Sequence, residues 1–375
     1  MRIDDIFVRA FSIPLGIQWS DQTHQHSSIE LVTVQMATDN GLTGVGFSYT
    51  VGAGATAIKS MIEWDLAPIL RGQAVTPLLH WSRLWGELHD VGGGGVSTAA
   101  LAAVDIAMWD LVAKARGQSL VDVLGSRRPS IPAYGSGIDL HLSLPQLVDE
   151  VKTWVSQGYR GVKIKVGKPT VEEDVERIAA VRDVVGPNVW MMVDANQGWN
   201  LTEAVARCAA FHRFDLHWLE EPLISDDVMG HHDLALRTSV PIAVGENIYN
   251  KYQLQQYLRL GAVNYAQIDV VRAGGITPYL EMANLCDAWN IPMAPHFMLE
   301  LSGQLLCSIP NAHILEDVNG GSLRDLGVLG SDVGVIKGQF TPPNVPGHGI
   351  AFDWNTLEDF PMGDVAPPSK RMLWT

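Results

Sequence analysis

The sequence predicts an α/β protein in which an α+β domain precedes a (β/α)-type barrel. Two observations carry this prediction. Residues 1–128 combine strand-like segments with helical patterns, whereas short apolar runs separated by helical segments recur from about residue 130 onward. Nearly every one of these runs ends in a charged or polar residue. Strands that alternate with helices build parallel barrels, and the carboxyl ends of such strands meet at the mouth where active sites lie.

The first domain, residues 1–128, is predicted to begin with strands and to continue with helices. Strand-like alternation covers Ile3–Ile13, Glu30–Asp39 and Gly44–Tyr49. Apolar residues at helical spacing predict helices over Thr56–Leu70 and Val96–Lys114. Gly117 follows the second helix and is typical of a helix stop.

The barrel is predicted over residues 129–334. Its candidate strands are Ser130–Tyr134, Gly161–Val166, Val189–Asp194, Leu216–Glu220, Val240–Glu246, Asn264–Asp269, Ile291–His296 and Ala312–Asp317. The last segment, residues 335–375, is rich in Pro and Gly, and we expect it to return to the first domain.

Composition and charge exclude several classes of protein. The net charge of −15 and the absence of a Lys/Arg run argue against nucleic-acid binding, which requires cations that neutralise phosphates. No stretch approaches the roughly 20 apolar residues of a membrane span. The 3 cysteines have no paired spacing and the first residues lack a signal-peptide pattern, so we expect a cytoplasmic location.

Three carboxylates end consecutive candidate strands: Asp194, Glu220 and Glu246. Neighbouring strands lie about 4.8 Å apart, so these side chains would crowd together at the barrel mouth. Such crowding is unfavourable unless a cation neutralises it. Three oxygen ligands with open positions for water and substrate suit Mg²⁺, which is the cofactor we expect.

Two lysines, Lys163 and Lys165, lie in the strand before this triad. The two-residue period of a strand places both on one face, which in a barrel is the interior. We expect each ammonium group to disfavour the charge of the other, so that the pKa of one lysine falls towards a value useful for a general base.

The remaining strand ends supply an Asp–His pair and a glutamate. Asp269 would orient the ring of His296 and raise its basicity, which gives a second acid/base group. Glu316 would close the ring, either as a protonated donor to a substrate carboxylate or as an exposed strand end. A cation on a carboxylate, with a base on each side of the α-carbon, suits abstraction of an α-proton through a metal-stabilised enediolate.

At these residues the sequence resembles the enolase superfamily, and specifically its mandelate racemase subgroup. The segments KIKVG, VDANQGW, WLEEP, VGEN, QIDVVRAGG and APHFMLE carry the resemblance in family order across the chain. It implies a modified (β/α)7β barrel of the TIM type with an α+β capping domain. The implied roles are metal ligands for Asp194, Glu220 and Glu246, a base for Lys165, a dyad for Asp269 and His296, and an electrophile for Glu316. Lys163 would touch the substrate carboxylate, and Asn196 would lie near substrate and metal. Relatives also imply an even-numbered homo-oligomer, such as an octamer.

The substrate is expected to be a small carboxylic acid. In the subgroup, loops of the capping domain set specificity, and here these would be Gly16–Ser28 and residues 50–55. The first loop is polar and carries Trp19 and His24, which we expect to contact substrate. With GFSYT and APHFMLEL, which look like the galactarate/talarate dehydratase branch, this favours dehydration of an acid sugar to a 2-keto-3-deoxy acid.

Other functions remain open at this point. A racemase or epimerase of a 2-hydroxy acid would use the same two bases without losing water. A non-catalytic barrel that only binds a ligand would be indicated by loss of a metal ligand or a base, and none is lost. A Schiff-base aldolase using Lys165 would leave the three carboxylates without a purpose.

Overall fold

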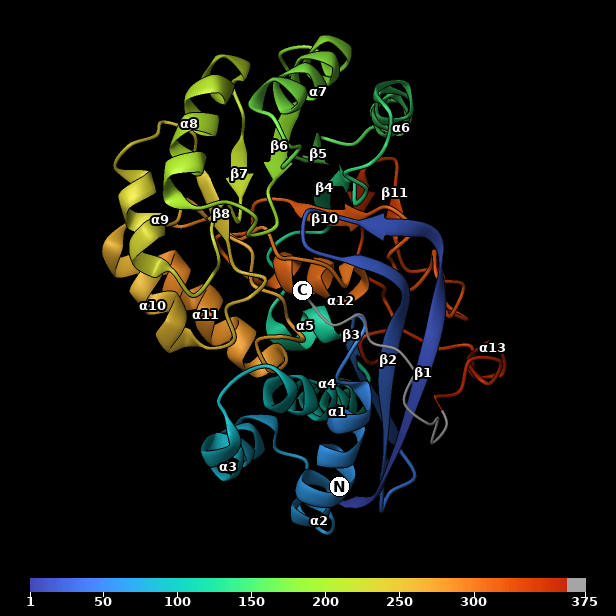
Figure 1. The fold of residues 1–375 in the computed structure, drawn as a ribbon. Coiled ribbons are helices and arrows are strands. Elements are labelled where there is room, and N and C mark those ends of the chain that lie inside the picture. The colour runs from blue at the N-terminus through green and yellow to red at the C-terminus, as the bar shows by residue number, and fades with distance from the viewer. Residues whose placement is uncertain (363–375) are drawn as a thin grey trace, which may run out of the picture.

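The computed structural model describes residues 1–362 and has the predicted fold class, an α+β capping domain joined to a modified barrel (Figure 1). In the capping domain, strands β1 (Ile3–Ser20), β2 (Gln25–Thr38) and β3 (Thr43–Thr50) form an antiparallel sheet. The helices of this part are α1 (Ala55–Met61), α2 (Ala67–Leu70), α3 (Pro77–Leu88), α4 (Val96–Arg116) and α5 (Leu120–Leu124), with a π-helical turn over Ile62–Leu66 and a 3-10 turn over His89–Val91.

Two predictions for this domain need correction. The loop predicted over Gly16–Ser28 is mostly strand, because β1 and β2 continue as a long hairpin that turns only at residues 21–24. The helix predicted over Thr56–Leu70 is interrupted by the π-helical turn. Pro68, near the start of α2, has no N–H group to continue the hydrogen-bond ladder, which accounts for the break.

Helix α4 connects the two domains. It begins at Val96 as predicted and ends before Gly117, which takes a left-handed conformation with φ 63°. Its length and apolar composition alone would suit a membrane span, but 83% of its apolar window is buried inside the protein. Asp105 on this helix accepts hydrogen bonds from the backbone N–H (2.9 Å) and hydroxyl (2.7 Å) of Thr277, at the start of a barrel helix. A core position between sheet and barrel therefore explains the apolarity of α4.

The barrel strands are β4 (Ile131–Ser136), β5 (Gly161–Lys165), β6 (Trp190–Asp194), β7 (Trp218–Glu220), β8 (Ile242–Val244), β9 (Tyr265–Ala266) and β10 (Leu315–Val318). Strands β4 to β9 pair in parallel in this order, and β10 pairs in parallel with β4. The helices are α6 (Leu144–Ser156), α7 (Val171–Val185), α8 (Leu201–Phe211), α9 (Val228–Ala235), α10 (Lys251–Leu260), α11 (Ile276–Ala288) and α12 (Leu299–Ser308), with a 3-10 turn over His212–Phe214.

The seventh candidate strand, Ile291–His296, is not a regular strand. Only Met293 forms β-bridges, one to Ala266 and one to Ala312, and these close the barrel between β9 and β10. Pro292 and Pro295 flank Met293 in the sequence and cannot donate backbone hydrogen bonds to a ladder. The prediction of a full strand was therefore wrong, although the chain passes through the position of one.

The final described segment contacts both domains. Strands β11 (Val335–Ile336) and β12 (Gln339–Phe340) pair with each other, and β12 pairs with β4. After helix α13 (Trp354–Leu357), the backbone N–H of Met362 donates to the carbonyl of Ala10 in β1. The rest of the segment predicted to return to the capping domain, residues 363–375, lies outside the described residues.

The barrel interior is filled with apolar side chains below the mouth. A buried cluster contains Tyr134, Met192, Trp218, Ala243, Ala294 and Ile314. Because side chains alternate along a strand, Met192 and Asp194 share one face of β6, and Trp218 and Glu220 share one face of β7. Each of these strands thus places an apolar residue in the interior and a carboxylate at the mouth.

A pair of histidines near the amino ends of the strands should make the protein acid-sensitive. Nε2 of His217 lies 2.7 Å from Nε2 of His313, and Trp190 stacks on both rings. Burial lowers the pKa of each imidazole to about 4, below the usual value of 6.5. The unfolded chain therefore binds more protons between these pH values, and stability falls as pH drops from 6.5 to 4.

We expect the melting temperature to fall as the pH drops from 6.5 to 4, and we expect this fall to be smaller in His217→Gln. Each imidazole lowers the free energy of unfolding by at most about 1.4 kcal/mol for each pH unit of this drop. The actual effect is smaller because the rings are partly exposed to solvent. Thermal denaturation between pH 4 and 7 measures the effect. His141→Gln, at an exposed position, is the control. An unchanged pH slope in His217→Gln would contradict the assignment.

Candidate active site

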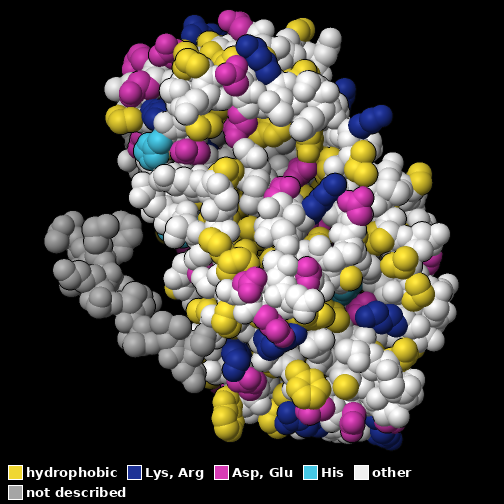
Figure 2. Space-filling view, turned by 90° about the vertical axis from the view of Figure 1, so that its right-hand side faces the viewer, with side chains coloured by type: hydrophobic (Ala, Val, Ile, Leu, Met, Phe, Trp, Pro, Cys, Tyr) yellow, Lys and Arg dark blue, Asp and Glu magenta, His cyan; other side chains and the backbone are white. Residues whose placement is uncertain are grey.

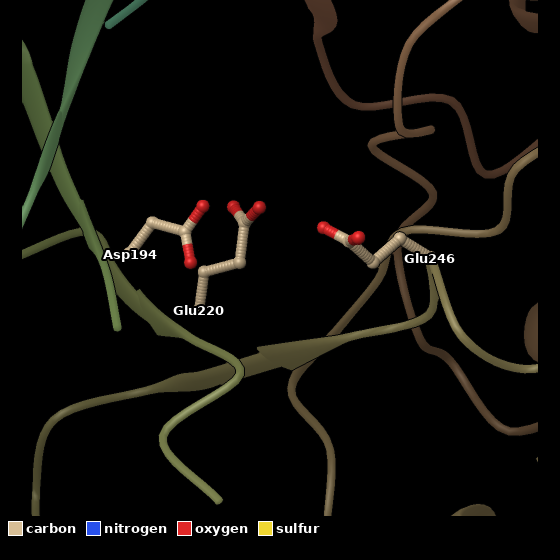
Figure 3. Close-up of side chains that lie close together, drawn as sticks. All are labelled: Asp194, Glu220 and Glu246. Carbon is tan, nitrogen blue, oxygen red and sulfur yellow. The ribbon is translucent and has the colours of Figure 1, made fainter. Parts of the chain in front are cut away.

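Three carboxylates meet at the barrel mouth. Asp194 and Glu220 are register partners that end β6 and β7, and Glu246 follows β8 after Gly245. One oxygen from each lies within 4.8 Å of the others. Figure 3 shows Asp194 and Glu220 side by side, with Glu246 facing them. Opposite ligands of one Mg²⁺ lie about 4.2 Å apart, so a small side-chain adjustment brings all three into bonding distance.

The burial of this group favours a bound cation. Asp194 and Glu220 are each 1% exposed. Burial and the neighbouring carboxylate of Asp194 raise the pKa of Glu220 to about 7, which shows how unfavourable the crowding is. Oδ1 of Asn196, which lies next to the triad in sequence, is buried and has no hydrogen-bond partner among the described residues. Hard oxygen donors of this kind fit Mg²⁺.

Both lysines of β5 point to the carboxylates. Nζ of Lys163 lies 2.5 Å from Oε1 of Glu220 and 2.7 Å from Oε1 of Glu316. Lys165 is the register partner of Asp194, and its Nζ lies 2.6 Å from Oδ2 of that residue. The parallel register of β5, β6 and β7 therefore places a lysine and two carboxylates in one row.

The expectation that paired ammonium groups lower a lysine pKa is wrong for these contacts. Burial, the largest effect, and Lys163 lower the pKa of Lys165, but Asp194 and Glu220 together outweigh them and raise it. The pKa of Lys163 is also raised, because Glu220 and Glu316 outweigh the effect of burial. The carboxylates of Asp194 and Glu220 thus favour the charged form of Lys165, and a cation that shares them would lower the lysine pKa again.

The Asp–His pair forms, although both residues lie in loops rather than at strand ends. Nδ1 of His296 lies 2.8 Å from Oδ2 of Asp269. An ionised carboxylate only accepts hydrogen bonds, so Nδ1 carries a proton and Nε2 is the nitrogen available for acid/base chemistry. Burial lowers the pKa of His296, but Glu246 and Asp269 outweigh it and raise the pKa above its usual value.

Glu316 is buried rather than exposed. It is 1% exposed, and its oxygens accept hydrogen bonds from the hydroxyl of Ser136 (2.8 Å) and the backbone N–H of Phe297 (2.9 Å). Burial by itself would raise the pKa of Glu316, but the ammonium group of Lys163 holds it well below the usual range. The alternative of an exposed strand end is therefore wrong, and the role of a donor to a substrate carboxylate stays a prediction.

A single cleft of ≈ 430 Å³ gathers the other expected residues. Its barrel side includes Lys163, Lys165, Asn196, His296 and Glu316, and its capping side includes Trp19 and His24. The Asn196 backbone N–H donates to Oδ1 of Asp194 at 2.9 Å. Glu220 and Asp269 lie behind this surface and support residues that line it.

Two residues of the cleft were not anticipated, Tyr49 and Arg272. The Tyr49 hydroxyl donates to Oδ2 of Asp269 at 2.5 Å, and Nη1 of Arg272 lies 2.9 Å from Oε1 of Glu246. Tyr49 belongs to the capping domain, so the spacing of residues within the barrel sequence could not reveal its contact with Asp269. The only available signal was strand alternation, which places Phe47 and Tyr49 on one buried face of β3.

Tyr49→Phe is expected to lower kcat about 10-fold with little change in KM. The hydroxyl holds the same Asp269 oxygen that orients His296, and a hydrogen bond to a charged group is worth about 1.5–3 kcal/mol. Steady-state kinetics measures this effect. Tyr159→Phe is a matched control, because Tyr159 donates to Asp317 outside the cleft. Full activity of Tyr49→Phe, or an equal loss in the control, would refute the role.

Charged side chains of both signs share the face of the molecule that Figure 2 shows. On the face seen in Figure 2, Lys/Arg and Asp/Glu side chains are interspersed and form no broad basic area. The cationic side chains described above are instead concentrated inside the cleft. This arrangement fits a small anionic ligand.

Comparisons with known proteins agree with this fold. Residues 146–356 match the family described as enolase C-terminal domain-like, and residues 5–125 match the mandelate racemase/muconate lactonizing enzyme N-terminal domain. The class defined by the capping domain, barrel and carboxylate triad is thus the enolase superfamily. Within it, the chain belongs to the mandelate racemase/muconate lactonizing enzyme family.

Similar proteins catalyse more than one reaction. The 3,6-anhydro-alpha-L-galactonate cycloisomerase of Streptomyces coelicolor is 34% identical over 363 residues, covering 96% of this chain and 100% of the relative. A racemase structure from Streptomyces coelicolor with bound magnesium has TM-score 0.92 and 33% identity, covering 96% and 100%. The L-talarate dehydratase of Polaromonas sp. JS666, with Mg and L-glucarate, has TM-score 0.90 and 32% identity, covering 96% and 98%.

Proposed function

We propose that this protein is a Mg²⁺-dependent dehydratase that converts an acid sugar to a 2-keto-3-deoxy acid. The observation that carries the proposal is the cleft itself, in which Lys165 and His296 come from opposite sides of the barrel around the carboxylate triad. The magnesium and L-glucarate bound to the similar talarate dehydratase support the same chemistry for this chain.

Asp194, Glu220 and Glu246 would hold the ion. When bound, Mg²⁺ would polarise the substrate carboxylate and offset the charge that develops on it as the α-proton leaves. Lys163 and Lys165 add positive charge on the same side of the cleft. The substrate carboxylate is therefore expected on the barrel side, with its carbon chain extending towards the capping domain.

Proton transfer falls to Lys165 and His296. One of the two takes the proton from the α-carbon, and the imidazolium form of His296 donates a proton to the departing β-hydroxyl, which leaves as water. The raised pKa of His296 favours that charged form. The resulting enol then takes up a proton at the β-carbon and becomes the keto acid.

A library of aldonates and aldarates, incubated with enzyme and Mg²⁺, tests the proposal. We expect one or a few members to give a product lighter by one water, which reacts as a 2-keto acid. Release of keto acid with no dependence on Mg²⁺ would contradict the assigned metal role. An absence of keto acid from every member would refute dehydration.

Racemisation or epimerisation of a 2-hydroxy acid is the second candidate. The specific observation in its favour is the placement of two bases on different sides of one cleft, which allows removal of a proton from one face and return to the other. The racemase from Streptomyces coelicolor has the same overall structure. Inversion at the α-carbon without keto-acid formation would identify this activity.

A further inference from the structure

Charge is distributed unevenly between the two sides of the cleft. Every lysine and arginine among the described residues that line it belongs to the barrel, namely Lys163, Lys165 and Arg272. The opposite wall is formed in part by the tip of the β1–β2 hairpin. We define the hairpin roof as Trp19, Ser20, Asp21, Thr23, His24 and His26, all of which line the cleft.

Asp21 is the only Asp, Glu, Lys or Arg residue of the hairpin roof, so the roof carries a negative charge. Oδ1 of Asp21 accepts hydrogen bonds from the backbone N–H groups of Thr23 (2.6 Å) and His24 (2.7 Å) and from the Thr23 hydroxyl (2.8 Å). These contacts all use one oxygen of the carboxylate. Its second oxygen, Oδ2, has no hydrogen-bond partner among the described residues and can accept one from a ligand.

Two histidine rings lie beside this carboxylate, and Nδ1 of His24 is 3.7 Å from Oδ1 of Asp21. The rings of His24 and His26 stack with centroids 5.3 Å apart and an interplanar angle of 18°. Burial and the adjacent His24 ring lower the pKa of His26, although Asp21 and Glu30 act in the opposite direction. A neutral imidazole offers one donor and one acceptor, which matches a hydroxyl group.

Further neutral polar groups lie along the same wall. Nε1 of Trp19, Oγ of Ser20 and Oγ1 of Thr50 are buried and lack a hydrogen-bond partner among residues 1–362. All three residues line the cleft. Buried polar groups are nearly always hydrogen-bonded. A ligand rich in hydroxyl groups would supply the hydrogen-bond partners that these three groups lack.

The cations on the barrel side of the cleft are held in place by neighbouring side chains. They can therefore reach only the end of a ligand that lies against the barrel. Arg272 is held by Glu246 at 2.9 Å and by Oδ1 of Asn247 at 3.0 Å, and Lys163 is held by Glu220 and Glu316. These contacts keep both cations on the barrel side of the cleft, which we call the floor. A second carboxylate at the far end of a ligand would lose its hydration beside Asp21 without gaining a counter-ion, which is unfavourable.

We propose that the substrate is a sugar acid with a single carboxylate, bound at the floor, and that its other end is an uncharged polyhydroxyl chain held by the hairpin roof. This rests on the proposed function and narrows its substrate class from acid sugars in general to monoacids. Asp21 is the specificity-determining residue, because it accepts a hydroxyl and repels a carboxylate.

Matched pairs of acids test this directly. Galactonate with galactarate, and gluconate with glucarate, differ only in whether the far carbon is an alcohol or a carboxylate. For each pair, kcat/KM is measured for keto-acid formation, and NMR in D₂O measures α-proton exchange. We expect the monoacid to be preferred at least 10-fold in a pair whose stereochemistry the site accepts.

Asp21→Asn removes the charge and keeps the Oδ1 acceptor that holds the turn. We expect kcat/KM for the diacid to rise, that for the monoacid to fall, and their ratio to change by at least 10-fold. Asp139→Asn is the control, because Asp139 also accepts a backbone N–H two residues on, from His141 (2.7 Å), but lies outside the cleft. If Asp21→Asn does not fold, His24→Lys places a cation on the same wall and should favour the diacid.

A diacid used as well as its matched monoacid by the unaltered enzyme would overturn the proposal, as would an unchanged ratio in both roof variants. These results would leave the proposed dehydration intact, because keto acid would still form. No exchange and no keto acid from any monoacid or diacid would instead refute the proposed function, and the monoacid proposal with it.

Discussion

Lys165→Ala and His296→Asn should each lower kcat by at least about 10³-fold while leaving Mg²⁺ binding intact. General acid–base groups typically contribute about 10²–10⁴-fold, and each of these residues is assigned a proton transfer that no neighbouring group replaces. Lys165 contacts Asp194, and His296 contacts Asp269, so removal of either leaves the three carboxylates in place. Turnover of acid sugars and calorimetric titration with Mg²⁺ measure the two effects separately.

Lys251→Ala serves as the control for the lysine variant, because Lys251 pairs with Glu281 on the surface. It should retain full activity. If Lys165→Ala kept more than about a tenth of wild-type turnover, the role of Lys165 as a base would be refuted, since removal of a general base lowers the rate far more than this. Loss of Mg²⁺ binding in either active-site variant would show a defect in the metal site rather than in proton transfer.

Glu246→Gln should weaken Mg²⁺ binding and lower turnover strongly. An amide oxygen carries no net charge, so the ion loses one of three anionic ligands, and the effect on a hard divalent cation is large. We expect metal affinity to fall at least about 10-fold and kcat/KM at least about 10³-fold. Titration with Mg²⁺ or Mn²⁺, followed by activity at saturating metal, measures both.

Glu281→Gln is the matched control, because this carboxylate is exposed and pairs only with Lys251 among the described residues. Its metal affinity and activity should equal those of the unaltered protein. Activity that survives Glu246→Gln at ordinary Mg²⁺ concentrations would remove Glu246 from the proposed ligand set. Arg272 contacts Glu246, so circular dichroism should confirm that the variant retains its fold.

The sequence was sufficient for the barrel and for the row of charged residues at its mouth. Strand alternation and strand-end position depend on local spacing, and the register then places Lys165 beside Asp194 and Asp194 beside Glu220. The same reasoning brought Asp269 and His296 together although neither ends a regular strand. Two prolines prevent a regular strand before His296, but the chain still follows the barrel wall.

Protonation states and contacts between domains could not be predicted in this way. Lys163, which the sequence makes visible, does lower the pKa of Lys165, but the direction of the net shift depends also on burial and on carboxylates such as Asp194, 2.6 Å away, which the sequence does not place. Tyr49 and Asp269 are 220 positions apart and meet only because the capping sheet covers the barrel. The polar segment that was predicted as a loop is a strand hairpin, and its conformation decides which groups form the roof of the cleft.

Exchange of the α-proton is the most direct test of the central claim that this cleft removes a proton next to a carboxylate. The unaltered enzyme is incubated with Mg²⁺ and acid sugars in D₂O and followed by NMR. We predict deuterium incorporation at the α-carbon, or loss of the α-proton with formation of keto acid, for at least one acid, and no such signal in the Lys165→Ala, His296→Asn double variant. Exchange that persists in the double variant, or that is absent from the unaltered enzyme with every acid tested, would contradict the account.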